Sequence, residues 1–205
     1  MRTDFKNWKP LNVSNIVSLF SEIPITWCLA GGWALDIHLG KKSREHSDID
    51  VIILRDQHQA AFQLLSREWK VLKAEGGVLL PWNEGEYLAH TTDVWVSKSH
   101  NSSWAFQIML VDTEDENWIY RREKSIKKPV NELIVRTYDG IPYLSPEIQL
   151  LYKGGSSKIR GRDFDDLQTM LPILTSQEKE WLSSSLLQQF PQGHPWVTYL
   201  QKGIK

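Results

Sequence analysis

The segment Asp48–Leu54, written DIDVIIL, constrains the fold more than any other part of the chain. Its last four residues form an unbroken apolar run, which is typical of a buried strand. Side chains alternate along a strand, so Asp48 and Asp50 are expected on one side and Ile49 on the other. Two carboxylates mounted side by side repel each other. The segment therefore predicts a core strand that carries a cation-binding pair at its head.

The residues before and after this strand alternate between helical and strand patterns. Helical spacing of apolar residues covers 11–23, 33–39 and 57–69, and strand patterns cover 25–30, 70–75, 91–97 and 103–111. This order predicts an α/β (α+β) fold built on a mixed β-sheet.

From about Ser145 onward the composition shifts to helix formers. Helices are expected over 145–155, 163–174 and 176–190, with Ser145 and either Thr175 or Ser176 as caps. No long Gly/Ser linker separates the two parts of the chain. The sequence therefore predicts an α/β domain over residues 1–143 and a C-terminal helical region, residues 144–205, packed on it.

Composition excludes several classes of protein. The formal net charge of −1 argues against non-specific nucleic-acid binding, which requires a surplus of lysine and arginine. Cys28 is the only cysteine, so neither an internal disulfide nor a cysteine-rich metal site can form, and the six histidines lack the spacing of a zinc site. No apolar window approaches the roughly 18 residues of a membrane span. A cytoplasmic protein without a membrane partner is therefore expected.

Three features close together in the sequence point to phosphate chemistry. Gly31 and Gly32 follow a strand and precede a helix, where backbone N–H groups can approach a phosphate closely. Arg44 lies in the basic stretch before Asp48 and Asp50 and could hold a polyphosphate. Mg²⁺ prefers carboxylate and phosphate oxygens as ligands. Together these residues predict a site for Mg²⁺ and a polyphosphate.

The stretch GGWALDIHLGKKSREHSDIDVII, residues 31–53, resembles the signature of the polymerase-β-like nucleotidyltransferases. Within that superfamily it is most similar to the aminoglycoside and lincosamide adenylyltransferases, and residues 118–123, 140–155 and 162–172 resemble further segments of that group. The resemblance implies a mixed-sheet nucleotidyltransferase core with a C-terminal helical region. It also implies metal-dependent transfer of a nucleoside monophosphate, AMP from ATP, to a hydroxyl of a small acceptor such as an aminoglycoside or lincosamide antibiotic, with release of pyrophosphate.

The superfamily uses a third carboxylate on an adjacent strand, as a metal ligand and as the base for the acceptor hydroxyl. This chain departs from that pattern, because the position expected to carry it is Gln107, which cannot act as a base. Strand alternation puts Asp93 on the same kind of open face as Gln107, so Asp93 is the expected third carboxylate. Asp112, at the end of the 103–111 strand, is the alternative.

The expected site residues fall into two groups. The expected catalytic residues and metal ligands are Asp48, Asp50 and Asp93, and the expected nucleotide-binding residues are Gly31, Gly32, Arg44 and Lys153. Lys153 either reaches the nucleotide or is an exposed helix lysine.

Four further features have structural interpretations beside functional ones. Asp36 is expected to hold the loop after its helix, and His46 to order the loop around Asp48. The acidic residues 163, 165 and 166 either form a solvated helix face or help to position the helical region. The acidic run 112–117 either attracts a cationic acceptor or forms a polar loop.

Two other functions stay open from the sequence alone. One is transfer of a nucleotide to a protein partner, for instance a toxin. The other is a nucleotide-binding module without turnover, which the glutamine at position 107 favours.

Overall fold

The computed structural model describes residues 1–202, which form two compact units. The first unit holds residues 1–33 and 44–113, and the second holds residues 34–43 and the chain from residue 114 onward. One border falls inside helix α2 (Gly31–Leu39), which begins in the first unit and ends in the second. No helix in the described chain combines the length and apolar character needed to cross a membrane.

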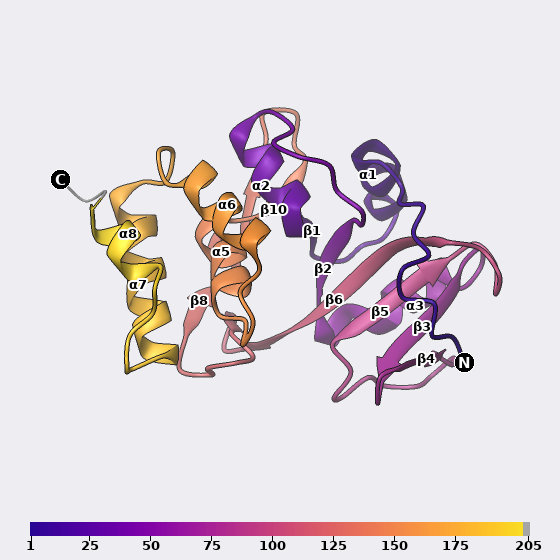
Figure 1. Cartoon of the computed structure of the whole chain (residues 1–205). Coiled ribbons are helices and arrows are strands. Elements are labelled where there is room, and N and C mark those ends of the chain that lie inside the picture. The colour runs from indigo at the N-terminus through magenta and orange to yellow at the C-terminus, as the bar shows by residue number, and fades with distance from the viewer. Residues whose placement is uncertain (203–205) are drawn as a thin grey trace. The chain divides into compact units, whose positions relative to one another are not determined.

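The first unit is built on a mixed β-sheet, as predicted. Its strands are β1 (Trp27–Ala30), β2 (Asp50–Leu54), β3 (Lys70–Glu75), β4 (Val78–Pro81), β5 (Asp93–Ser97) and β6 (Trp104–Glu114). They lie in the order β4-β3-β5-β6-β2-β1, with β2 and β6 parallel and the other neighbours antiparallel. Figure 1 shows β6, β5, β3 and β4 side by side. The expected α/β class is confirmed.

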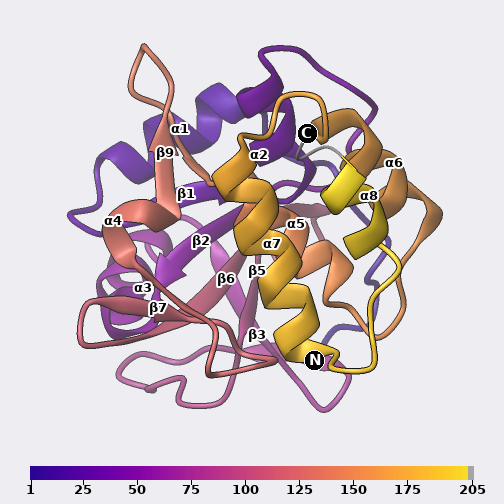
Figure 2. The same ribbon diagram turned by 90° about the vertical axis from the view of Figure 1, so that its left-hand side faces the viewer.

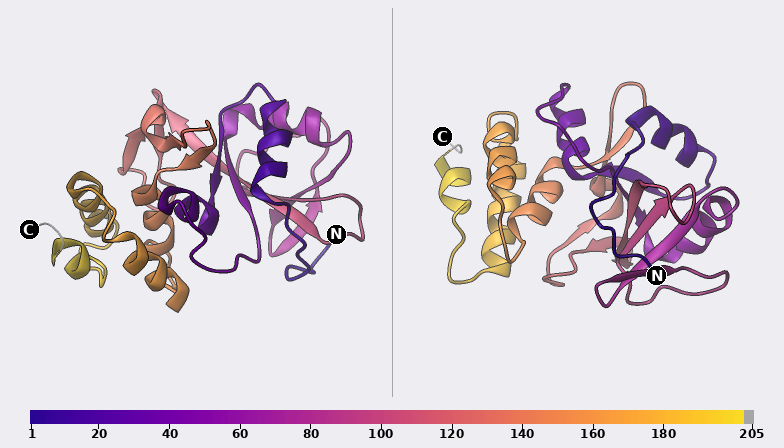
Figure 3. Two further views of the ribbon diagram at one scale, coloured as in Figure 1. Left: turned by 90° about the horizontal axis from the view of Figure 1, so that it is seen from above. Right: turned by 45° about the vertical axis from the view of Figure 1, so that its right-hand side comes forward.

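One face of this sheet is apolar and covered by helices. Phe106 on β6 is fully buried there. Phe20 on helix α1 (Val13–Ser21) has its ring centroid 5.8 Å from that of Phe106. Trp69, shortly after helix α3 (His58–Leu65), lies 5.6 Å from the same ring. The helix α1, in indigo, can be followed in both views of Figure 3.

The opposite face of the sheet carries both apolar and polar side chains and is only partly covered. Trp95 pairs with Gln107 and Asp93 pairs with Met109 across β5 and β6, and all four side chains are half-buried. Trp8 of the N-terminal segment packs on Trp95, with ring centroids 4.7 Å apart. Because residues that pair across two strands share a face, the expectation that Asp93 and Gln107 lie on one face is confirmed.

The second unit combines two small hairpins with a group of helices. Its hairpins are antiparallel and pair β7 (Asn117–Ile119) with β8 (Lys127–Pro129) and β9 (Ile134–Arg136) with β10 (Pro142–Leu144). Its helices besides α2 are α4 (Val130–Leu133), α5 (Pro146–Gly154), α6 (Gly161–Met170), α7 (Ser176–Gln189) and α8 (Val197–Lys202). Helix α7 packs on α5 and α8, and Figure 2 shows α7 as the long helix in the centre of the view.

Helix boundaries in this unit follow the expected capping chemistry. Thr175 caps α7, because its side chain accepts from the backbone N–H of Glu178 while the Glu178 carboxylate accepts from the backbone of Thr175. Pro146 stands in the first turn of α5, where its missing N–H costs nothing. The three helices expected after Ser145 are present, although α6 ends at Met170, two residues before Pro172.

Another border between the compact units lies at 113/114, whereas composition places the start of the helical region at residue 144. Residues 114–144 belong with the helices because their side chains contact α5. The Trp118 indole donates to the Tyr152 hydroxyl over 3.2 Å, the Tyr120 hydroxyl donates to the Leu151 carbonyl over 3.3 Å, and Lys128 pairs with the buried Glu147. Sequence composition does not report such contacts, so the shift toward helix formers marks the start of the helices and not the border of this compact unit.

Strand β4 was not expected from the sequence. It forms a hairpin with β3 through Gly76 and Gly77, whose φ angles of 56° and 78° suit a tight two-residue turn. The Gly-Gly pair between two apolar stretches was the signal for this hairpin.

Candidate active site

The open face of the first unit brings together side chains from three neighbouring strands. Asp50 is the first residue of β2 and pairs with Gln107 of the parallel strand β6. Gln107 pairs in turn with Trp95 of β5, and Asp93 stands at the start of that same strand. Neighbouring residues on one face of a sheet have Cβ atoms about 5 Å apart, and diagonal neighbours are within reach of long side chains. The expected residues Asp50 and Asp93 therefore flank Gln107 on one surface.

Asp48 lies two residues before β2 rather than inside it, because the strand begins at Asp50. Sheet pairing nevertheless reaches Ile49, whose carbonyl accepts from the Gln107 N–H over 3.0 Å. Ile49 is fully buried while Asp48 and Asp50 are half-buried, which is the alternation expected of an extended segment. The Trp33 indole donates to the Asp48 carbonyl over 3.2 Å and anchors this segment.

The Gly31-Gly32 turn lies directly against the acidic and basic residues of the site. Gly31 has a φ of 66°, and a Cβ atom there would lie 2.3 Å from Asp50 Oδ2. A Cβ atom on Gly32 would lie 2.3 Å from the His46 ring and 2.9 Å from Arg44 Nη2. Only glycine permits this close approach. The structure thus places the expected phosphate turn, Arg44 and Asp50 together.

His46 contacts Arg44 in its own loop and Trp33 in helix α2. Its Nδ1 lies 3.1 Å from Arg44 Nη1, and its ring centroid lies 4.8 Å from that of Trp33. Since Trp33 also holds Asp48, these contacts support the expectation that His46 orders the loop around Asp48.

The Asp93 carboxylate has a fixed orientation. Gln107 Nε2 donates to one of its oxygens over 2.7 Å, and the Thr92 hydroxyl donates to the other over 2.6 Å. Each carboxylate oxygen therefore accepts one hydrogen bond from a neutral donor.

Asp112, the alternative third carboxylate, lies near the C-terminal end of β6, away from Gln107. It lies five residues beyond Gln107 on β6, about 17 Å away at the usual rise of a strand. Its carboxylate accepts from Nε and Nη2 of Arg55, the latter over 3.4 Å. The distance between Asp112 and Asp50 depends on the register between β2 and β6. Strand alternation does not give that register, so it could not exclude Asp112.

Arg55, which sequence reasoning missed, organises this far end of the sheet. It begins the short 3-10 helix η1 (Arg55–Gln57) directly after β2, and it is buried. Besides Asp112, its guanidinium donates to the carbonyls of Leu88, over 2.7 Å, and of Thr91. It thereby fixes the segment that leads into Asp93. In the sequence, the signal for this buried residue was a single arginine directly after an apolar strand.

Replacing Arg55 with leucine is expected to lower the free energy of unfolding by about 2–4 kcal/mol, because two buried carbonyls and Asp112 lose their donor. The midpoint of urea unfolding followed by tryptophan fluorescence measures this change. Arg67→Leu is the matched control, since Arg67 is exposed and should shift the free energy by no more than about 0.5 kcal/mol. Equal midpoints for the two variants would contradict the role given to Arg55.

Lys153 lies in the second unit and is buried rather than exposed. Its Nζ is 2.8 Å from Asp166 and 3.8 Å from Asp163, and Arg160 also pairs with Asp163 over 2.7 Å. Burial raises the pKa of Asp163, but the hydrogen bonds from Arg160 and the charges of Arg160 and Lys153 outweigh it, so the pKa lies below its usual value. The alternative of an exposed helix lysine is wrong. Nucleotide binding by Lys153 stays a prediction.

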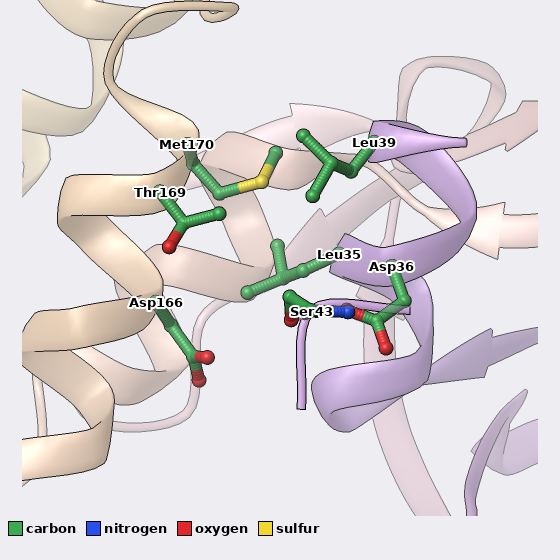
Figure 4. Close-up of a pocket in the computed structure, with 7 residues that line it drawn as sticks. All are labelled: Leu35, Asp36, Leu39, Ser43, Asp166, Thr169 and Met170. Carbon is green, nitrogen blue, oxygen red and sulfur yellow. Dashed lines mark hydrogen bonds between the residues drawn. The ribbon is translucent and has the colours of Figure 1, made fainter. Parts of the chain in front are cut away.

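Asp36 holds the loop after its helix, as expected. Both the backbone N–H and the hydroxyl of Ser43 donate to Asp36 Oδ1. Figure 4 shows this pair beside a small pocket of the second unit, with Asp166 and Met170 of α6 on its other side.

The acidic run 112–117 covers the end of β6, a two-residue turn and the first residue of β7. Asp112 is bound to Arg55, and Glu114 pairs with Lys127. Asp115 and Glu116 have φ angles of 47° and 62° and form the two-residue turn between β6 and β7. This geometry supports the structural interpretation of the run over attraction of a cationic acceptor.

The donor set of the site is suited to Mg²⁺ bound together with a nucleotide. Among residues 1–202, no three histidine, cysteine, aspartate or glutamate side chains gather closely enough to form a metal site by themselves. Mg²⁺ is usually held by one or two carboxylates, with waters and substrate phosphates as the other ligands. Asp50, next to the backbone of Gly31, offers carboxylate oxygen at the place where a phosphate could approach.

Comparison with known proteins identifies the family. Residues 12–170 match the family model of the aminoglycoside-2″-adenylyltransferases. A lincosamide resistance protein of Staphylococcus haemolyticus is 40% identical over 50 residues, which are 24% of this chain. That match spans only 31% of the relative's length.

Solved structures share the fold. The lincosamide antibiotic adenylyltransferase LnuA, with lincomycin bound, aligns with a TM-score of 0.56 at 23% identity, over 82% of this chain and 99% of that one. ANT(2″)-Ia in complex with adenylyl-2″-tobramycin aligns with a TM-score of 0.54 at 12% identity, over 84% of this chain and 95% of that one. These likenesses confirm the expected nucleotidyltransferase fold. The family match over residues 12–170 shows that the chain belongs to the aminoglycoside-2″-adenylyltransferase family.

Proposed function

We propose that this protein transfers AMP from ATP to a hydroxyl group of an aminoglycoside or lincosamide antibiotic and releases pyrophosphate. The observation that carries the proposal is the open sheet face, where Asp50 lies against the Gly31 turn and Asp93 stands one strand beyond Gln107. Membership of the family supports the reaction class. The structural relatives with lincomycin and adenylyl-tobramycin support these two acceptor classes.

The residues proposed to bind the triphosphate and the metal ion have separate roles. The backbone N–H groups of the Gly31-Gly32 turn and the guanidinium of Arg44 bind the triphosphate. Asp48 and Asp50 are the residues that would hold Mg²⁺, with Asp93 as a further ligand. When bound, the metal supplies positive charge that stabilises the phosphate oxygens and the leaving pyrophosphate. Lys153 is the remaining candidate for a nucleotide contact.

Asp93 accepts the proton of the attacking hydroxyl. The hydroxyl oxygen forms a bond to the α-phosphorus, and the bond from that phosphorus to the bridging oxygen of the β-phosphate breaks in line with it. The proton goes to the Asp93 carboxylate, and the electron pair of the broken bond leaves with pyrophosphate. The products are the adenylylated acceptor and pyrophosphate, so atoms and charges balance.

Transfer of label from ATP tests the proposal. The protein is incubated with Mg²⁺ and ATP labelled at the α-phosphorus, in parallel with tobramycin, with lincomycin and without acceptor. Label on one antibiotic with equimolar pyrophosphate is the expected result. Binding of ATP without label on either antibiotic and without pyrophosphate would contradict it. A labelled protein band in a lysate, with unlabelled antibiotics, would instead favour transfer to a protein partner.

Gly31→Ala is expected to lower the rate of transfer by about a hundredfold, because the new Cβ atom would lie 2.3 Å from Asp50 Oδ2 and must displace that carboxylate. The rate at saturating ATP and acceptor measures the effect. Gly76→Ala is the matched control, since Gly76 also has a positive φ, 56°, but has open space around it. Both variants should lose stability from backbone strain, whereas only Gly31→Ala should lose activity. An active Gly31→Ala variant would argue against Asp50 as a site residue.

A further inference from the structure

Gln107 occupies the central position of the candidate site. It lies on β6, between the strand that carries Asp50 and the strand that carries Asp93. Its direct partners across the sheet are Asp50 on one side and Trp95 on the other, and Asp93 is its diagonal neighbour. An uncharged side chain therefore stands between two carboxylates.

The hydrogen bond between Gln107 and Asp93 has a defined direction. Gln107 Nε2 lies 2.7 Å from Asp93 Oδ1. An ionised carboxylate can only accept, so the amide must present its NH₂ group to it. The Thr92 hydroxyl holds the other Asp93 oxygen over 2.6 Å. With one donor on each oxygen, rotation of the Asp93 carboxylate is restricted.

We propose that Gln107 is a positioning residue, which holds the Asp93 carboxylate in the orientation needed to accept the proton of the acceptor hydroxyl. This inference rests on the proposed function. A carboxylate at position 107 could not do the same, because it has no hydrogen to donate and would add a negative charge beside Asp50 and Asp93. The glutamine is thus part of the proposed machinery rather than a sign of lost catalysis.

Steady-state kinetics of three variants test the inference. Gln107→Met keeps the size of the side chain but removes the donor, and it should lower kcat about tenfold, with KM for ATP within about twofold of wild type. Thr92→Val removes the other donor and should act in the same direction. Gln107→Glu should lower kcat about a hundredfold, because the like charges repel. Gln188→Met, on the exposed side of α7, should leave kcat unchanged.

A double-mutant cycle separates positioning from a structural role. If Gln107 acts through Asp93, Gln107→Met should reduce kcat in the wild-type background but not in the Asp93→Asn background. An equal reduction in both backgrounds, or wild-type kcat in Gln107→Met, would overturn the inference. So would a gain of activity in Gln107→Glu. A wild-type protein that transfers no nucleotide would instead refute the proposed function itself, so the two failures are distinguishable.

Discussion

Asp50→Asn is expected to lower the rate constant of nucleotide transfer by about a thousandfold, because several kcal/mol of charge stabilisation are lost and each ~1.4 kcal/mol is a factor of ten. The asparagine keeps the size of the side chain and its place against Gly31. It offers one neutral oxygen instead of two charged ones. Asp48→Asn is expected to act in the same direction, since Asp48 belongs to the same carboxylate pair.

The measurement is release of pyrophosphate in single-turnover reactions with MgATP and the antibiotic that the wild type modifies. Asp56→Asn is the matched control, because Asp56 is an exposed aspartate of the same unit in η1, beyond the other end of β2. It should retain wild-type activity. Full activity of both Asp48→Asn and Asp50→Asn would show that the carboxylate pair does not serve this reaction.

Local sequence patterns were sufficient for the parts of the site that lie on one segment. The alternation of Asp48, Ile49 and Asp50 predicted which side chains share a side, and their burial agrees with it. Alternation also placed Asp93 and Gln107 on one face, although the two residues are on different strands. The alternation of apolar and polar residues shows which side chains share a face, because the core buries one face of a strand and leaves the other open.

Contacts between segments far apart in the sequence could not be predicted from such local patterns. Arg55 binds Asp112, 57 positions away in sequence, at the end of β2 opposite to Asp50. Lys153 is buried and pairs with Asp163 and Asp166 of the next helix, which contradicts the alternative of an exposed helix lysine. Both outcomes depend on strand register and helix packing, which no single segment encodes.

Asp93→Asn is expected to lower kcat by a factor of about 10²–10⁴, the usual contribution of a positioned general base. Asparagine fits the same space and can still pair with Gln107, because the Gln107 amide can turn to present its oxygen. The loss should therefore fall on kcat, while KM for ATP changes little. Rates with saturating MgATP and acceptor, together with melting temperatures, measure the two effects separately.

Asp112→Asn distinguishes the two carboxylates that the sequence left open. Asp112 pairs with Arg55 at the far end of β6, so its replacement should weaken the fold through Arg55 while kcat stays near that of the wild type. Asp93→Asn should show the opposite combination, with kcat lost and stability largely kept. If Asp112→Asn abolished turnover and Asp93→Asn did not, the base would have to be assigned to Asp112. The register that pairs Asp50 with Gln107 would then not describe the active arrangement of this sheet.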